Sequence, residues 1–288
     1  MSGFTLPSAS LLSQSILSGV FVGALYGLMG LGVSLSWGLL RLINLAHFAF
    51  AFLAAYLCYQ MATMGVDPLL TLVVIVPMFF ALGAGLHWVM ARFAVTPFNS
   101  LLLTFGLMGI VEAIIQTIWT ADFRKLESSY AQQKFKVGTL FVPIPEFITL
   151  LLAVGISVAV WAVLRYTDLG KAMRAAAEDA PIASAFGVNQ ARNALLLAGL
   201  CSALASIAGV CLALSFTLAP SQMYAWIGVV FAAVMLGGLG RALGPLIAGT
   251  VIGVSEAFTM AVTAPSWAPI VSFTLLIFVL VLRPGKAS

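Results

Sequence analysis

Charged residues are scarce in this chain of 288 residues. It has 13 lysines and arginines and 9 aspartates and glutamates, 8% of the sequence, where an average soluble domain has roughly 25%. A soluble fold of this size needs a mostly polar outer layer, which so few charges cannot supply. Because 62% of the residues are hydrophobic, we expect lipid to surround most of the chain. The net charge of +4 is small and spread between apolar runs, which excludes a nucleic-acid-binding protein.

Residues that bind metals or carry out covalent chemistry are also few. The three cysteines, Cys58, Cys201 and Cys211, all lie inside apolar runs and are interpreted as small buried hydrophobic residues. Two isolated histidines do not provide the ligand spacing of a metal site. Neither of the phosphate-binding patterns G-x-G-x-x-G and G-x-x-x-x-G-K-S/T occurs. We expect no catalytic residue, no metal and no cofactor bound by this chain, so that any ATP it depends on is hydrolysed by another protein.

Long apolar runs without lysine or arginine are what the sequence does contain. A helix needs roughly 20 such residues to cross a bilayer core of about 30 Å. Nine runs result, at approximately 11–40, 43–64, 69–91, 98–120, 147–164, 193–219, 225–240, 244–263 and 268–282. The seventh and ninth are short enough to be half-helices. The predicted fold class is an all-α, polytopic membrane bundle of about 8–10 transmembrane segments, forming a single domain over 1–288.

The basic residues form two unequal groups when they are assigned to alternating sides of the membrane. The larger group is Arg41, Arg92, Arg165, Lys171, Arg174, Arg192, Arg241, Arg283 and Lys286, and the smaller is Arg124, Lys125, Lys134 and Lys136. The positive-inside rule makes the side with the larger group cytoplasmic, which places the N-terminus outside and the C-terminus inside. The N-terminal residues lack the basic region of a signal peptide, so the first run is expected to remain a membrane span.

Two connections are long enough to do more than turn the chain. The external loop 121–146 mixes both signs of charge with aromatic residues, which fits either a docking surface for an extracytoplasmic partner or a plain solvated loop. The cytoplasmic segment 165–192 predicts a short helix capped by Thr167 or Asp168 and, after a break near Pro181, a second short helix ended by Gly187. Two short helices joined by a sharp bend form a compact unit, which we call the knob (165–192). We expect it to fit into a complementary surface, or socket, on another protein.

Glycines and a faint internal echo add two structural expectations. Gly19, Gly23 and Gly27 recur at four-residue spacing along one face of the first run, which favours close helix packing over a glycine-lined substrate path. Separately, the stretch 109–113, Gly-Ile-Val-Glu-Ala, recurs as Gly-Val-Ser-Glu-Ala at 253–257. A duplicated transporter half and a chance match in a biased composition both explain that echo.

Polar side chains inside the apolar runs are candidates for the translocation pathway, because an ionisable group in a bilayer is costly unless it pairs, faces water or stays neutral. Glu112 and Glu256 lie deep in their runs, where a protonated carboxyl group bonded to a neighbouring helix is an equal alternative. Asn44 and His47 are three residues apart at the start of the second run, hence on one helix face. There they are placed to satisfy backbone groups of a broken helix.

Four segments resemble one family. RLINLAH at 41–47, TDLGKAMRAAAEDAPIASAFGVN at 167–189, VMLGGLGRALGPLIAG at 234–249 and LRPGK at 282–286 resemble the membrane-permease subunit of bacterial branched-chain amino acid ABC importers, the LivH type. The second segment looks like that family's loop that inserts into the ATPase subunit. The resemblance implies that the ATPase-coupling residues are Asp168, Gly170, Lys171, Ala172, Arg174, Ala175, Asp179, Ala183, Gly187 and Asn189. One departure is Phe48, where the family usually has glycine after the histidine.

The resemblance also implies partners and a location. A second permease subunit, expected to be a paralogue, would enclose the path together with this chain in the bacterial inner membrane. Two cytoplasmic ATPase subunits would use ATP, and an extracytoplasmic substrate-binding protein would deliver branched-chain or related amino acids. Two other functions stay open at this point. One is an ion-coupled secondary transporter that uses Glu112 or Glu256, and the other is a passive channel for a small polar solute.

Overall fold

The computed structural model describes residues 8–93, 96–128, 130, 133–263 and 267–282, most of them helical. The described elements are α1 (Ala9–Leu40), α2 (Ala46–Thr63), α3 (Leu72–Arg92), α4 (Pro97–Trp119), β1 (Lys134–Val137), β2 (Leu140–Pro143), α5 (Ile144–Tyr166), α6 (Asp168–Glu178), α7 (Ala180–Ala185), α8 (Gln190–Ser215), the 3₁₀ helix η1 (Pro220–Gln222), α9 (Met223–Gly237), α10 (Gly244–Val262) and α11 (Ala268–Leu282). Arg283 and Lys286, two of the basic residues used for the predicted orientation, lie outside the described residues.

Seven of the described helices are long and apolar enough to cross a membrane: α1, α3, α4, α5, α8, the segment η1–α9, and α10. The two other predicted spans form α2, which carries His47 and Gln60, and α11, which has 15 residues. A helix of that length is about 22 Å long, shorter than a bilayer core. The fold is the predicted all-α membrane bundle, and counting α2 and α11 with the seven described candidate spans gives nine, within the predicted range of 8–10.

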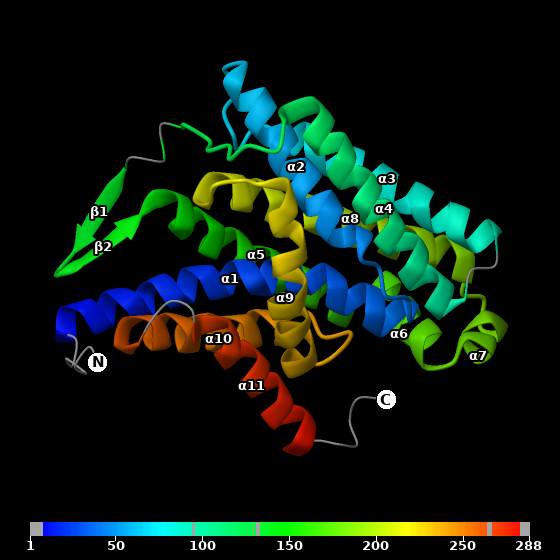
Figure 1. The fold of residues 1–288 in the computed structure, drawn as a ribbon. Coiled ribbons are helices and arrows are strands. Elements are labelled where there is room, and N and C mark those ends of the chain that lie inside the picture. The colour runs from blue at the N-terminus through cyan, green and yellow to red at the C-terminus, as the bar shows by residue number, and fades with distance from the viewer. Residues whose placement is uncertain (1–7, 94–95, 129, 131–132, 264–266, 283–288) are drawn as a thin grey trace.

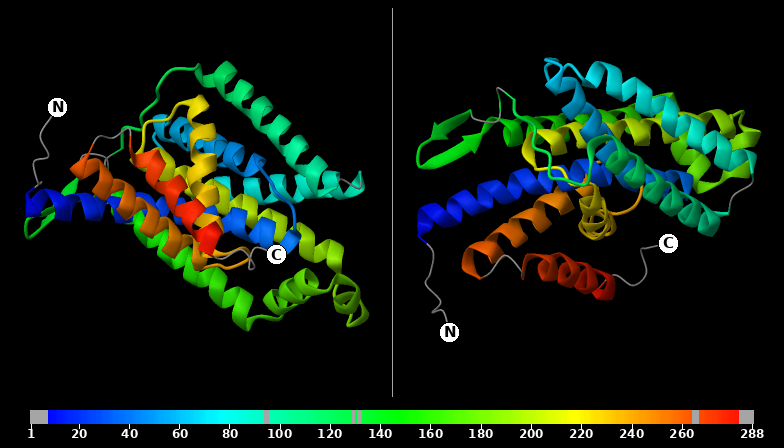
Figure 2. Two further views of the ribbon diagram at one scale, coloured as in Figure 1. Left: turned by 60° about the horizontal axis from the view of Figure 1, so that its bottom comes forward. Right: turned by 45° about the horizontal axis from the view of Figure 1, so that its top comes forward.

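The helix α1 is the centre of this bundle. It begins after Ser8, whose hydroxyl accepts a hydrogen bond from the Leu11 amide, and it ends at Arg41 in the left-handed conformation, with φ of 56°. Most residues in its second half are buried, because it contacts α5, α8, α9 and α10. Figures 1 and 2 show α1 running through the middle of the molecule beside α10. A helix that is apolar on all sides is expected in such a place.

Glycines bring α1 and α10 together at backbone distance. A Cβ atom added to Gly23 would lie 2.5 Å from the carbonyl oxygen of Gly249, and one added to Gly19 would lie 2.7 Å from that of Gly253. One added to Gly27 would lie 2.5 Å from an α10 Cα atom. The four-residue spacing thus places all three α1 glycines on the face that meets α10, opposite two α10 glycines at the same spacing.

The helix contacts divide the bundle into two sets that pack on each other reciprocally. The first helix of the set α1–α4 packs on the third helix of the set α8–α11, and α8 packs on α3 in the same way. The contact of α1 with α9 likewise corresponds to the contact of α8 with α2, and the contact of α2 with α4 corresponds to that of α9 with α11. In this correspondence between the two sets, α3 is the equivalent of α10. Because Glu112 lies on α4 and Glu256 on α10, the sequence echo around them does not mark equivalent positions.

The loop 121–146 contains a hairpin that the sequence analysis does not anticipate. Strands β1 and β2 pair antiparallel around a two-residue turn in which Gly138 has φ of 62°. The Gln14 side chain on α1 donates to the Phe141 carbonyl and accepts from the Phe141 amide, at 2.9 and 3.0 Å. This hairpin is therefore attached to the start of α1 rather than free in solvent.

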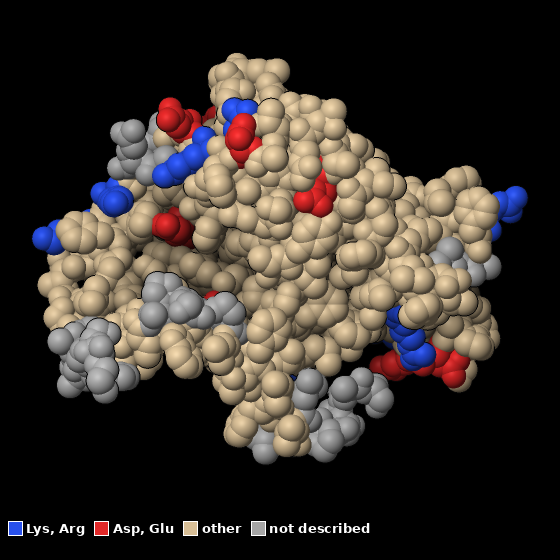
Figure 3. Space-filling model, viewed as in Figure 1, with Lys and Arg blue, Asp and Glu red and all other residues tan. Residues whose placement is uncertain are grey.

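Further contacts hold the rest of the loop against neighbouring connections. The Tyr130 hydroxyl donates to the Asp67 carboxylate in the α2–α3 turn at 2.5 Å, and this hydrogen bond lowers the pKa of the Asp67 carboxyl group. Arg124 and Leu218 exchange two backbone hydrogen bonds. Figure 1 places the hairpin and the helices α6 and α7 at opposite ends of the bundle, and most charged side chains in Figure 3 lie toward those two ends.

Candidate functional site

Helix α6 is fixed at its start by a cap and by a glycine. The Thr167 hydroxyl accepts a hydrogen bond from the Gly170 amide at 3.1 Å, so Thr167 is the cap and Asp168 is the first helical residue. A Cβ atom on Gly170 would clash with backbone atoms of Val163 and Leu164. The glycine therefore lets α6 fold back directly against the end of α5, which gives the segment 165–192 a defined angle to the bundle.

Helix α7 has a cap at each end. The Asp179 carboxylate accepts from the Ile182 amide at 2.9 Å, and Pro181 lies in the first turn. Gly187 ends the helix with φ of 86°, which is the left-handed conformation expected of it. The amides of Gly187 and Val188 donate to the carbonyls of Ser184 and Ala183, the two bonds of a Schellman motif. The Asn189 side chain then caps α8 by accepting from the Arg192 amide. The segment is thus a folded knob.

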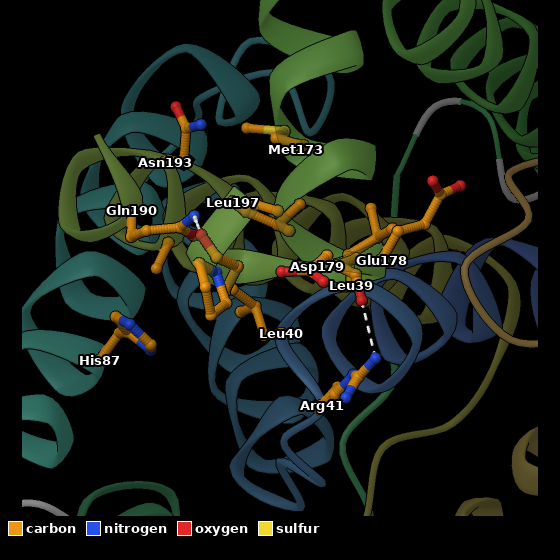
Figure 4. A pocket seen from close by; sticks show the side chains of 15 residues that line it. Leu39, Leu40, Arg41, His87, Met173, Glu178, Asp179, Gln190, Asn193 and Leu197 are labelled. Carbon is orange, nitrogen blue, oxygen red and sulfur yellow. Dashed lines mark hydrogen bonds between the residues drawn. The ribbon is translucent and has the colours of Figure 1, made fainter. Parts of the chain in front are cut away.

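Two side-chain hydrogen bonds join this knob to the bundle. Arg41, at the end of α1, donates from Nη2 to the Ala177 carbonyl at 2.8 Å, and Gln190 donates to the Ala180 carbonyl at 2.9 Å. Figure 4 shows both bonds at a pocket of about 510 Å³ between the knob and the ends of α1, α3 and α8. His87 lines the same pocket. Because Arg41 is the residue that ends the central helix α1, this hydrogen bond joins α6 to the end of α1.

The residues predicted to couple to an ATPase have different places in the knob. Gly170 and Ala183 are buried and Ala172 is half-buried, while Asp168, Lys171, Arg174 and Ala175 are exposed; Asp168 and Lys171 form an ion pair at 3.0 Å. On α7 and directly after it, two large apolar side chains that the sequence analysis did not single out are exposed, Ile182 at 56% and Phe186 at 86%. The available indication in the sequence was that both large apolar residues fall in the short helix that ends at Gly187. Exposed large apolar side chains that lie close together often mark an interaction site.

Glu256 is enclosed by two hydroxyl groups. It is 7% exposed on α10 and accepts hydrogen bonds from Tyr26 on α1, at 2.9 Å, and from Ser272 on α11. The carboxyl group therefore joins the consecutive helices α10 and α11 to α1, which is more than 200 residues away in the sequence. A buried carboxyl group whose hydrogen bonds are all made to neutral hydroxyls has a structural role, provided that it is not protonated or deprotonated during transport.

Replacing Glu256 by glutamine is expected to have a small effect, because the amide oxygen still accepts from one of the two hydroxyls. Glu256→Leu removes the acceptor of both hydrogen bonds, and loss of the acceptor for the part-buried Tyr26 hydroxyl costs about 1–3 kcal/mol. We expect Glu256→Gln to transport normally and Glu256→Leu to unfold at lower temperature in detergent. Severe transport loss in Glu256→Gln with normal assembly would instead place this carboxyl group in the pathway.

Glu112 has a different environment. It lies half-buried on α4, where it accepts from the Tyr224 hydroxyl on α9 at 2.7 Å and from Gln116 at 3.1 Å. Both hydrogen bonds are open to the surroundings of the chain. Of the two glutamates, only Glu112 is placed to meet a molecule or a second chain from outside.

Asn44 lies in the connection between α1 and α2, and His47 lies in the first turn of α2. His47 is 2% exposed; its ring packs against Gly32, and its Nε2 donates to the Met29 carbonyl at 3.0 Å. The Asn44 side-chain oxygen is buried without a hydrogen-bond partner. Phe48, the departure from the family pattern, is fully buried and stacks on Phe231 with 6.2 Å between ring centroids. It fills space beside the His47 ring.

The four pathway candidates lie in three separate places: Asn44 and His47 at or just before the start of α2, Glu112 on α4 and Glu256 on α10. No hydrogen bond joins any two of them within the described part of the chain. The groups of metal-ligating side chains that would define a metal site are also absent from the described residues. The clearest organised feature is the knob, at one end of a bundle with seven candidate membrane spans. Fold and knob together define a multi-pass helical membrane protein with a folded, capped element at one end of the bundle.

Comparison with known proteins identifies the family. The chain matches the family described as branched-chain amino acid transport system permease components over residues 15–280, and it belongs to that family. It is 27% identical to the high-affinity branched-chain amino acid transport system permease protein LivH of Salmonella typhimurium, over 94% of this chain and 93% of that protein. The corresponding protein BraD of Pseudomonas aeruginosa is 26% identical over 94% of both chains.

Two further comparisons agree. A probable branched-chain amino acid transport permease protein LivH of Methanocaldococcus jannaschii is 28% identical over 84% of this chain and 80% of that protein. Among solved structures, PsaBC from Streptococcus pneumoniae in complex with Fab matches 94% of this chain and 91% of that chain, with a TM-score of 0.51 and 13% identity. At that identity the likeness shows a shared fold. The chain is therefore a transport component of the permease family.

Proposed function

We propose that this chain is the membrane-spanning permease subunit of an ATP-binding-cassette importer for branched-chain or related amino acids. The single observation that carries the proposal is the knob of α6 and α7, capped at each end and presenting Ile182 and Phe186 outward. The names of the relatives support the substrate class. Two cytoplasmic ATPase subunits, which use the ATP, would receive the knob.

The rest of the assembly follows from the two ends of the bundle. The knob end carries most of the basic residues and is assigned to the cytoplasm of a bacterial inner membrane, with the N-terminus outside and the C-terminus inside. The opposite end carries the hairpin, where all four residues of β1 are exposed. That hairpin is the proposed contact for the extracytoplasmic substrate-binding protein. A second permease subunit, a paralogue, would complete the path.

Alternating access is the proposed mechanism. Closure of the ATPase pair moves each knob, and the Gly170 contact with α5 and the Arg41 hydrogen bond to α6 carry that movement into the bundle. A nucleotide shifts the permease only by its differential affinity for the two states. The linkage must therefore be stiff. Of the four pathway candidates, Glu112 is the one proposed to face the path, because His47 and Glu256 are enclosed by the chain itself.

Gly187→Val is expected to leave the chain inserted and folded but to reduce ATPase association about tenfold. Valine adopts the left-handed conformation at a cost of roughly 1–3 kcal/mol, which is relieved when the end of α7 unwinds and Phe186 loses its position. Retention of the ATPase subunits on the affinity-purified permease measures the effect.

The matched control is Gly65→Val. Gly65 has φ of 88° against 86° for Gly187, and a Cβ atom on either meets nothing within 4 Å. It lies in the α2–α3 turn, on the side of the bundle away from the knob. The control is expected to retain the ATPase subunits. Equal retention in both variants would show that the end of α7 has no part in the association.

A further inference from the structure

A hollow of about 990 Å³ opens on the surface of the bundle beside the knob. Its walls come from the end of α5, from α6, from the turn between α9 and α10, and from the first half of α10. Three arginines line it, namely Arg165 on α5, Arg174 on α6 and Arg241 in the turn, and no acidic residue is among its lining residues. Three like charges around one opening favour an anionic ligand.

Within the described residues, no carboxylate forms an ion pair with these three guanidinium groups, because the one ion pair there joins Lys171 and Asp168. Arg165 instead lies over two aromatic rings, 5.4 Å from the Trp161 ring centroid and 5.7 Å from that of Tyr166. Arginine with tryptophan and tyrosine at the end of a membrane span is typical of the membrane–water interface.

The wall that leads away from the arginines is apolar. Ile247, Ala248 and Val251 line it from α10, and Ile247 is 65% exposed. At 1.5 Å per residue, α10 extends about 10 Å from Gly244 to Val251. The hollow thus has positive charge at its interfacial end and an apolar strip along the span, which is the amphipathic pattern of a phospholipid.

We propose that this hollow binds one anionic phospholipid, its phosphate held by Arg165, Arg174 and Arg241 and one acyl chain lying along Ile247 and Val251. Guanidinium groups form paired, charge-assisted hydrogen bonds with phosphate oxygens. Basic pockets between membrane helices on the cytoplasmic side are suited to anionic headgroups. A zwitterionic lipid brings a cationic group to the same three charges and binds less well. The site stands independently of the substrate assigned to the transporter.

Native mass spectrometry of the purified full chain tests the proposal, with phosphatidylglycerol and phosphatidylcholine of identical acyl chains. The wild-type chain is expected to prefer phosphatidylglycerol at least fivefold. The double variant Arg165→Gln, Arg241→Gln is expected to bind it at least tenfold more weakly, while Arg165→Lys, Arg241→Lys keeps most of the affinity. Arg174 is left unchanged because it belongs to the knob. The control Arg92→Gln, Arg192→Gln removes the same charge elsewhere and is expected to bind as the wild type does.

Three results would overturn the proposal. Equal loss in the double variant and its control would mean general attraction between the lipid and a basic chain. Displacement of phosphatidylglycerol by glycerol phosphate, which has no acyl chains, would mean a site for free phosphate. Loss of the lipid on assembly with the ATPase subunits would mean that a protein covers the hollow. Ile247→Asn, which keeps every charge, is expected to weaken lipid binding because the acyl chain contributes.

Discussion

Gly23→Leu is expected to abolish the folded protein. The α1 and α10 backbones leave no room at this position, because even a Cβ atom on Gly23 would lie 2.5 Å from the Gly249 carbonyl oxygen and from the Thr250 Cα atom. Both atoms belong to backbone that cannot rotate away. Forcing a side chain into such a contact costs at least about 1–3 kcal/mol where the neighbours can adjust, and more here. Separation of α1 from α10 would also open the Tyr26 to Glu256 hydrogen bond.

The measurement is the yield of monodisperse protein in detergent, followed by its thermal unfolding. Gly155→Leu is the matched control, since Gly155 lies in the candidate span α5 and a Cβ atom there meets nothing within 4 Å. We expect the control to match the wild type in yield. A Gly23→Leu protein with the wild-type yield and unfolding temperature would show that α1 and α10 are not packed at backbone distance.

Ile182→Asp combined with Phe186→Asp is expected to abolish association with the ATPase subunits while the permease stays folded. Both side chains point away from the bundle, so neither substitution disturbs its packing. Burying a side chain of this size in a partner contributes about 1.5–3 kcal/mol. Loss of two such contacts, and the introduction of two charges into an apolar socket, weakens binding by more than a hundredfold.

Co-purification of the ATPase subunits and ATP hydrolysis stimulated by the loaded binding protein measure the loss. Phe123→Asp is the control, because Phe123 is 73% exposed but lies in the loop at the opposite end of the bundle. It is expected to retain the ATPase subunits fully. Normal association of the double variant would assign the socket to another surface.

Much of the fold could be predicted from local patterns in the sequence. Long apolar runs indicated the membrane helices. The ends of the short helices could also be predicted, because a cap such as Thr167, Asp179 or Gly187 forms hydrogen bonds only with residues a few positions away. The hairpin was missed because its strands have four residues each, too few for a clear alternation. Its turn around Gly138 was the available indication.

The partners of the buried polar groups could not be predicted in the same way. Tyr26 is 230 residues from Glu256, and Tyr224 is 112 residues from Glu112. Only the packing of α1 on α10 and of α4 near α9 decides that these side chains meet. The glycines spaced four residues apart on α1 identified one side of the contact between α1 and α10. The same spacing of Gly249 and Gly253 would have identified the other side.

Site-specific photo-crosslinking in the assembled complex tests the central claim most directly. A benzophenone side chain is placed at Phe186 or, as the control, at Phe123, so that one aromatic residue is exchanged at either end of the bundle. The account predicts a crosslink from position 186 to an ATPase subunit and none from position 123. A complex that is active but gives no ATPase crosslink from position 186, or gives one from position 123, would contradict it.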